Sequence, residues 1–152
     1  MVAAVVDSST LISLAWAGIL DLLASSPIRL IVPKAVHEEA VEQGRLQGHA
    51  DAAAIEFAVT SLEIRSGNHQ GSVDERVLQL GREVGFLLTN DVALGRRALN
   101  LGVGWLRTAD LVVVSARLNR ITPERGRAAL QSLHDSGRIT PELLDAYRKE
   151  LV

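Results

Sequence analysis

The N-terminal stretch is the part of this sequence that most constrains the fold. Residues 1–6 (MVAAVV) form an unbroken apolar run, and residues 7–10 (DSST) are all polar. An apolar run without alternation indicates a strand buried on both faces, as in a parallel sheet covered by helices. In such sheets, ligands bind just beyond the carboxyl ends of the strands. Asp7 stands at that position, so the sequence predicts a polar site at the end of the first strand.

Short apolar segments alternate with helical patterns along the rest of the chain. Further strands are expected at 28–32, 62–64, 85–88 and 103–105. Helices are expected after residue 7 with a break near 18, from 33 to 41, and at 50–59, 73–84, 94–101 and 109–118. Pro33 suits the first turn of its helix, a hydroxyl among residues 8–10 suits the first N-cap, and 44–48 suits a connection. This alternation predicts an α/β fold with a parallel sheet and helices on both faces.

The C-terminal part repeats a helix-start pattern. Residues 120–124 and 138–142 both read RITPE. Threonine supplies the cap, proline the first turn and glutamate a charge that suits the positive helix end. We therefore expect an antiparallel helical hairpin at about 122–151, after a core at about 1–118, in a single domain spanning 1–152.

Composition excludes several classes of protein. The chain of 152 residues contains no cysteine, so disulfides, thiolate zinc sites and cysteine nucleophiles are excluded. The net charge of −2 gives no global positive field, so any nucleic-acid site must be local. The start lacks the basic region of a signal peptide, and no segment approaches the roughly 20 apolar residues of a membrane span. We expect a cytoplasmic protein with no membrane association.

Carboxylates follow several of the expected strands. Asp7 and Asp91 come directly after strands, Glu39 lies in the helix after the second strand, and Asp74 opens a later helix. The carboxyl ends of parallel strands share one edge of a sheet, so the four acids are expected to converge. Converging carboxylates raise one another's pKa and need compensation, which Mg²⁺ or Mn²⁺ with its preference for oxygen ligands provides.

Neighbouring polar residues suit supporting roles around such a metal. Ser9, Thr89 and Asn90 are placed to orient the acids or hold water. Arg96 and Arg97 follow Asp91 by one helical turn and are candidates for contact with a phosphate.

Each acid also fits an ordinary structural role when taken alone. Asp74 suits the first turn of a helix, and Asp91 suits an N-cap. Glu39 shares its helix with Glu38 and Glu42. Only the combination of the four acids favours a catalytic metal site.

Four segments in order resemble the PIN-domain family of nucleases: residues 5–12 (VVDSSTLI), 32–39 (VPKAVHEE), 71–78 (GSVDERVL) and 87–91 (LLTND). The resemblance implies a three-layer α/β/α fold with a central parallel sheet of about five short strands. It also implies Mg²⁺- or Mn²⁺-dependent hydrolysis of RNA phosphodiesters, with Asp7, Glu39, Asp74 and Asp91 as the acids and Ser9 near the metal. Many relatives have glycine and glutamate where this chain has Val73 and Asp74, so Glu75 stays an alternative for the third acid.

The resemblance also implies partners. Many compact PIN-domain proteins are toxins of toxin–antitoxin pairs, in which a small antitoxin protein plugs the acidic pocket, and a homodimer is implied too. The chain has few aromatic side chains, so an RNA substrate would be recognised by its shape rather than by base stacking.

Other functions remain open at this point. One is a non-catalytic PIN-like domain that binds RNA or protein, and another is a metal-dependent phosphatase with the same metal chemistry. A phosphoacceptor receiver domain fits less well, because arginine and threonine, not lysine, follow the last strand at 107–108. A dinucleotide-binding domain is excluded because no glycine-rich loop follows the first strand.

Overall fold

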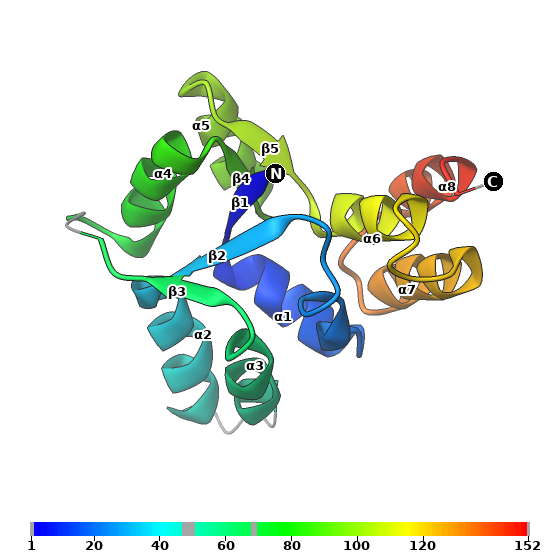
Figure 1. Cartoon of the computed structure of the whole chain (residues 1–152), viewed down its shortest axis with the longest axis horizontal. Helices are drawn as coiled ribbons and strands as arrows, with labels where there is room; N and C mark the ends of the chain where they lie inside the picture. Colours follow the sequence, from blue (N-terminus) through cyan, green and yellow to red (C-terminus); the bar gives the residue numbers. More distant parts are fainter. Residues whose placement is uncertain (1, 47–50, 68–69, 152) are drawn as a thin grey trace.

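A parallel sheet of five strands forms the centre of the molecule, in the order β3-β2-β1-β4-β5 (Figure 1). The computed structural model describes residues 2–46, 51–67 and 70–151. The strands are β1 (Ala3–Val6), β2 (Arg29–Pro33), β3 (Glu63–Arg65), β4 (Phe86–Leu88) and β5 (Gly104–Leu106). All neighbouring strands run parallel, so their carboxyl ends lie along one edge of the sheet.

The central strand β1 explains the apolar N-terminal run. Val5 pairs with Ile31 of β2 and with Leu87 of β4. Val5 and Leu87 are fully buried because helices cover both faces of the sheet. Both faces of β1 therefore need apolar side chains, as the unbroken run predicts.

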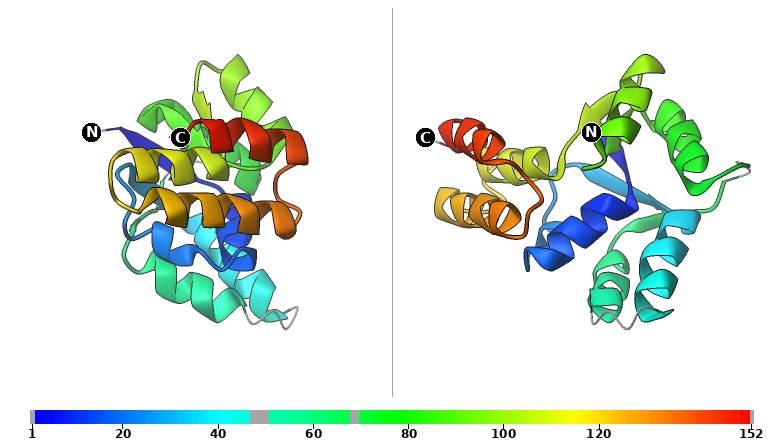
Figure 2. Two further views of the ribbon diagram at one scale, coloured as in Figure 1. Left: turned by 90° about the vertical axis from the view of Figure 1, so that its right-hand side faces the viewer. Right: turned by 180° about the vertical axis from the view of Figure 1, so that it is seen from behind.

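Helices cover the two faces of the sheet, which confirms the predicted fold class. They are α1 (Ser8–Trp16), α2 (Lys34–Leu46), α3 (Asp51–Val59), α4 (Val73–Val84), α5 (Val92–Asn100), α6 (Thr108–Arg117), α7 (Pro123–Asp135) and α8 (Pro141–Lys149), with a short 3₁₀ helix η1 (Leu20–Leu22). Helices α4 and α5 lie on one face, and α1 to α3 lie on the other (Figure 1). Helices α6, α7 and α8 gather beside α1 at one end of the molecule (Figure 2).

The predictions for Pro33 and for the N-cap of the first helix were wrong. Pro33 ends β2, paired with Arg65, and α2 starts one residue later, because a strand end tolerates a residue without an N–H group. The N-cap of α1 is Asp7, without a side-chain cap bond. Hydroxyls of Ser9 and Thr10 bond to other groups instead, the latter to the Leu88 carbonyl.

The connection predicted at 44–48 was also wrong at its start, since α2 continues to residue 46. Residues 47–50 lie outside the part of the chain described here, and so does the predicted first residue of the next helix.

The two C-terminal helices begin as the repeated pattern predicts. The Thr122 hydroxyl accepts the Arg125 N–H at 3.1 Å, and the Thr140 hydroxyl accepts the Leu143 N–H at 3.2 Å. Proline occupies the first turn of both helices. Helix α7 packs against both α6 and α8, which holds the hairpin to the rest of the fold.

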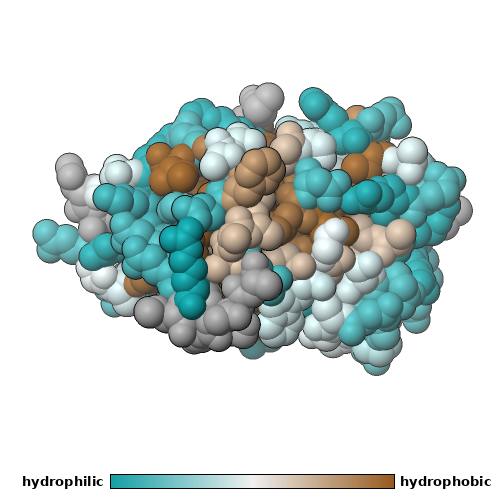
Figure 3. All heavy atoms as spheres, turned by 90° about the horizontal axis from the view of Figure 1, so that it is seen from below, coloured by the Kyte–Doolittle hydropathy of each residue, from teal (hydrophilic) through white to brown (hydrophobic). Residues whose placement is uncertain are grey.

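Apolar side chains also reach the surface. Figure 3 shows an apolar strip across the middle of one face, in the region of α3. On α3, Phe57 is 81% exposed, and Ala53 and Ala54 are exposed beside it. No helix among the described residues is long and apolar enough to cross a lipid bilayer.

Candidate functional site

The ends of β1 and β4 place two of the predicted acids side by side. Asp7 follows β1 and Asp91 comes shortly after β4, and these two strands are direct neighbours in the sheet. Glu39 lies in α2, which follows β2 on the other side of β1. Asp74 lies in the first turn of α4, which packs against β1 and β4. The fold therefore brings the four predicted acids to one edge of the sheet.

Asp7 is 4% exposed, and its two carboxylate oxygens have different surroundings. Oδ2 accepts hydrogen bonds from the Ser9 hydroxyl at 3.0 Å and from the Thr89 hydroxyl at 2.9 Å. No described side chain donates a hydrogen bond to Oδ1. A buried charge needs such donors, and two hydroxyls on one oxygen orient the carboxylate while the other oxygen stays available for a ligand.

Asp91 serves as the N-cap of α5. Its Oδ1 accepts the Leu94 N–H at 3.1 Å, and its own N–H donates to the Thr89 hydroxyl at 3.0 Å. The helix N-terminus favours a negative charge at this position. The capping role and a place in the acid site are therefore compatible, since only one of the two carboxylate oxygens is used by the cap.

The electrostatics link all four carboxylates. Burial, followed by the charges of Asp7 and Asp74, raises the pKa of Glu39, while a hydrogen bond from Ser8 lowers it. Partial burial, followed by the charges of Asp7 and Asp91, raises the pKa of Asp74. Such mutual repulsion is the signature expected of carboxylates that share a site.

The neighbouring acids face other groups. Glu38 lies 3.8 Å from Lys34, in an exposed pair along α2. The Glu75 carboxylate lies against Gly71 rather than toward the other acids. Electrostatic contact with Asp7 therefore belongs to Glu39 and Asp74.

The carboxylate oxygens are the right type of ligand for a hard divalent cation, but the side chains are not spaced as a coordination sphere. Carboxylate oxygens are the ligands that Mg²⁺ and Mn²⁺ prefer. Within residues 2–46, 51–67 and 70–151, no three histidine, cysteine, aspartate or glutamate side chains are close enough to hold a metal ion. Rotations of side chains would be needed to bring Asp7, Glu39, Asp74 and Asp91 onto one cation.

The three predicted supporting residues form one hydrogen-bonded group. The Ser9 hydroxyl accepts the Asn90 N–H at 3.0 Å and lies 3.0 Å from the Thr89 hydroxyl. Thr89 is fully buried. The Asn90 side chain does not contact the acids, because it donates to Ser13 at 2.9 Å and accepts the Thr108 N–H at 3.1 Å.

Sequence reasoning missed the continuation of this group toward the C-terminal hairpin. The Ser13 hydroxyl donates to the Ser9 carbonyl at 2.6 Å and accepts from Arg138 Nε at 3.0 Å. The Arg138 guanidinium also lies over the Trp16 ring, 4.7 Å from its centroid. The position of Ser13 one helical turn after Ser9 was a signal for the first contact, whereas nothing local pointed to Arg138.

The two predicted arginines differ in their relation to the acids. Arg97 interacts with Asp74 and opposes the upward shift of the Asp74 pKa. Arg96 is exposed and forms no ion pair with any described residue. Of the two arginines, Arg97 is the one whose charge acts on the pKa of an acid of the site.

One apolar cavity lies away from the acids. It measures about 670 Å³ and is lined mostly by apolar side chains, among them Val2, Ile28, Phe86, Val113 and Leu118. The first three stand at or just before the starts of β1, β2 and β4, at the opposite edge of the sheet from Asp7.

Comparisons with solved structures and with family models both found matches. The fold is similar to that of a PilT N-terminus domain protein from the hyperthermophilic archaeon Sulfolobus solfataricus P2, with 17% sequence identity and a TM-score of 0.49, over 74% of this chain and 92% of that chain. No curated protein matches the chain. A family model described as a PIN domain matches residues 3–151, nearly the whole chain, and this protein therefore belongs to the PIN-domain family.

Proposed function

We propose that this PIN domain is a Mg²⁺- or Mn²⁺-dependent ribonuclease that hydrolyses RNA phosphodiesters at the edge of the sheet where Asp7 and Asp91 lie. The observation that carries the proposal is the electrostatic coupling of four carboxylates, in which burial and the neighbouring acids raise the pKa of Glu39 and of Asp74. Four acids that repel one another at a strand end are costly in a protein unless a cation binds there.

The acids and their neighbours have distinct tasks in this proposal. Asp7 would help to hold the cation, and Ser9 and Thr89 orient its carboxylate by donating to Oδ2. Asp91, Glu39 and Asp74 would supply the other carboxylates around the cation, and Asp91 also caps α5. When bound, the divalent cation supplies charge stabilisation for the phosphate and makes a water molecule more acidic.

Membership of the PIN-domain family supports nuclease chemistry over other reactions of phosphate esters. The small antitoxin, the homodimer and the cytoplasmic location stay predictions that rest on the resemblance and on composition. A toxin role would place an antitoxin segment over the acid site, in competition with RNA.

Comparison of the wild type with Asp7→Asn tests the proposal. Each protein is incubated with a pool of structured and single-stranded RNAs and with Mg²⁺ or Mn²⁺. The substitution keeps the shape of the side chain and removes its charge, so we expect the cleavage rate to fall by about 100-fold or more. Asp145→Asn, which alters an exposed carboxylate on α8, is the matched control and should leave the rate unchanged.

Four results would contradict the proposal. Equal cleavage by the wild type and Asp7→Asn would place the chemistry elsewhere. Cleavage that persists in the presence of a chelator would rule out the metal-dependent mechanism. Turnover of a phosphate monoester such as p-nitrophenyl phosphate, without turnover of RNA, would identify a phosphatase, and binding of RNA without any turnover would identify a non-catalytic domain.

A further inference from the structure

A second cavity lies on the same edge of the sheet as the acids. It measures about 210 Å³ and is located where β2 and β3 end, between the start of α2 and the middle of α4. Its lining includes three cationic side chains, Lys34, Arg65 and Arg76, and one acidic side chain, Glu38. We refer to this feature as the basic cavity.

The cations of the basic cavity are only partly neutralised. Lys34 pairs with Glu38 at 3.8 Å, but both side chains are about half exposed, so the pair is weak. Arg65 pairs with Glu63, which also binds Arg29. Arg76 forms no ion pair with any residue in the described part of the chain. The cavity therefore has an excess of positive charge.

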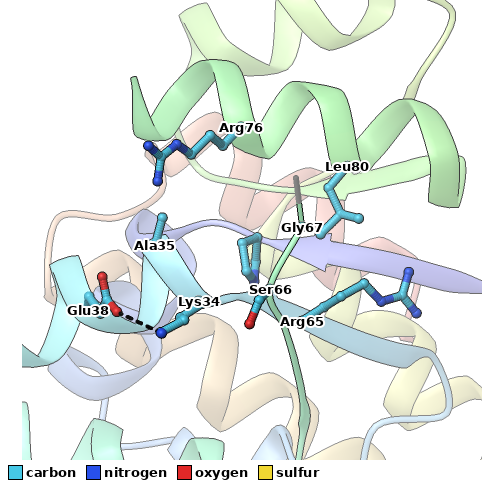
Figure 4. A pocket seen from close by; sticks show the side chains of 9 residues that line it. Lys34, Ala35, Glu38, Arg65, Ser66, Gly67, Arg76 and Leu80 are labelled. Carbon is cyan, nitrogen blue, oxygen red and sulfur yellow. Dashed lines mark ion pairs between the residues drawn. The ribbon is translucent and has the colours of Figure 1, made fainter. Parts of the chain in front are cut away.

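Figure 4 shows how these side chains lie around the cavity. Arg76 extends from α4 toward the first turn of α2, where Lys34 and Glu38 lie side by side. Arg65 extends from the end of β3 toward the opposite side, and Ser66 lies between. The three cations that line the cavity thus come from different elements, and the Arg65 guanidinium points away from Lys34 and Arg76.

The order of the strands places the basic cavity next to the acids. Along the carboxyl edge, β3 and β2 contribute Arg65 and Lys34, and the next two strands lead to Asp7 and Asp91. Arg76 follows Asp74 by two residues on α4. Arg97 lies in α5, beyond β4, and interacts with Asp74 from the other side. The acids are therefore flanked by positive charge on both sides.

This sequence of charges fits a polyanion that crosses the edge of the sheet. An RNA strand carries one negative charge per nucleotide, and proteins neutralise it with lysine and arginine. The acids repel every phosphate except the one neutralised by a cation, so the neighbouring phosphates need positive partners close by. The basic cavity provides such partners on the β3 side, and Arg97 provides one on the α5 side.

We propose that the basic cavity of Lys34, Arg65 and Arg76 is a binding site for a backbone phosphate of the RNA, next to the phosphate that is cleaved. The proposal rests on the proposed ribonuclease function and assigns the path of the RNA strand along the sheet edge. The strand then runs from Arg97, over the acids, to Arg76.

Binding measurements on a cleavage-deficient background separate this proposal from catalysis. The affinity of a short, fluorescently labelled single-stranded RNA is measured by anisotropy at several salt concentrations, with Asp7→Asn as the parent protein. We expect Arg76→Gln to weaken binding by about threefold to tenfold and to lower the salt dependence by about one phosphate contact. Lys34→Gln should act in the same direction.

Arg82→Gln is the matched control. Arg82 is exposed on the same helix, does not line the basic cavity, and its substitution removes the same charge. We expect it to change the affinity by less than about twofold, because distant surface charges are screened by salt. Equal losses for Arg76→Gln and Arg82→Gln would overturn the proposal, since a general charge effect would then explain both.

A second readout uses catalysis in the otherwise wild-type protein. For a long single-stranded RNA, Arg76→Gln should raise KM and leave kcat nearly unchanged. For a dinucleotide, which has only the cleaved phosphodiester between its nucleosides, Arg76→Gln should have no effect. A KM that is unchanged for the long RNA would overturn the phosphate site and leave the ribonuclease proposal standing. RNA binding that depends on Arg76 in a protein without cleavage activity would support the phosphate site and overturn the ribonuclease proposal.

Discussion

The carboxylate of Asp7 shows how a charge is kept at the end of a buried strand. Ser9 and Thr89 both donate to one oxygen, and Thr89 in turn accepts the N–H of Asp91. The hydroxyls satisfy the buried charge without neutralising it, as no arginine or lysine contacts Asp7 among the described residues. The negative charge therefore remains available to a cation, and its repulsion acts on Glu39 and Asp74.

Removing one of these charges should stabilise the metal-free protein. Because burial and nearby acids raise the pKa of Asp74, the folded state binds a proton there more tightly than the unfolded chain does. The charged carboxylate thus destabilises the fold above its folded pKa, and the effect disappears as the pH falls below the unfolded value of about 3.9. We expect Asp74→Asn to raise the melting temperature at about pH 7 in a chelator, and to raise it less at about pH 3.

Calorimetry with and without Mg²⁺ checks this prediction. Binding to the folded state stabilises a protein by mass action, so Mg²⁺ should raise the melting temperature of the wild type more than that of Asp74→Asn. Asp145→Asn provides a control for loss of an exposed charge. A melting temperature of Asp74→Asn below that of the wild type at neutral pH would contradict the repulsion described here.

Two helical glycines differ in how closely a neighbouring element packs against them. A Cβ atom added to Gly95 in α5 would lie 2.1 Å from the ring of Trp105 in β5, whose indole N–H donates to the Thr89 carbonyl. We expect Gly95→Ala to destabilise the protein by about 1–3 kcal/mol through this overpacking. Gly81→Ala in α4 meets only Val103 at 3.4 Å and should be neutral or stabilising by up to about 1 kcal/mol. Urea denaturation measures both, and equal effects would contradict this interpretation.

Most elements were predictable because their signals are local. The apolar run of β1, the caps of α7 and α8 and the break near Gly18 are contained in a few neighbouring residues. The start of α2 was predicted wrongly because a proline suits both the end of a strand and the first turn of a helix. Pairing of Pro33 with Arg65 decides between these, and that contact joins distant parts of the sequence.

The grouping of the four acids was also predictable from local signals, but the contacts between distant residues were not. Asp7 and Asp91 follow recognisable strands, Asp74 opens a helix, and Glu39 lies in the helix after β2. The shared edge of a parallel sheet was therefore enough to group them. Sequence could not supply the contact between Arg138 and Ser13, which are 125 positions apart. The basic cavity was also missed, because Lys34, Arg65 and Arg76 look like ordinary surface cations until the fold places them around one space.

At the scale of the whole molecule, the C-terminal hairpin is tied to the acid site. Arg138, in the connection between α7 and α8, donates to Ser13 and lies over Trp16, both in α1. Ser13 also accepts from Asn90, which follows β4. A chain of hydrogen bonds therefore joins the hairpin, the first helix and the loop that carries Asp91.

Removing the Arg138 contacts should lower the free energy of unfolding more than removing a surface ion pair does. We expect Arg138→Ala to lower the free energy of unfolding by about 1–2 kcal/mol, from one hydrogen bond and one cation–π contact. Arg125 lies in α7 of the same hairpin and forms an exposed ion pair with Asp21 of η1. Arg125→Ala removes this pair and should lower the free energy of unfolding by about 0.2–1 kcal/mol. Equal losses in chemical denaturation would show that the contact with Ser13 contributes little.

The order of the elements along the chain also separates the four acids into two pairs. Asp7 and Glu39 precede β3, whereas Asp74 and Asp91 come after it, and β4 must pair beside β1 before all four can meet. A growing chain on the ribosome therefore carries only Asp7 and Glu39 until β3 has been made. The four carboxylates can meet at one edge of the sheet only after translation has passed β4.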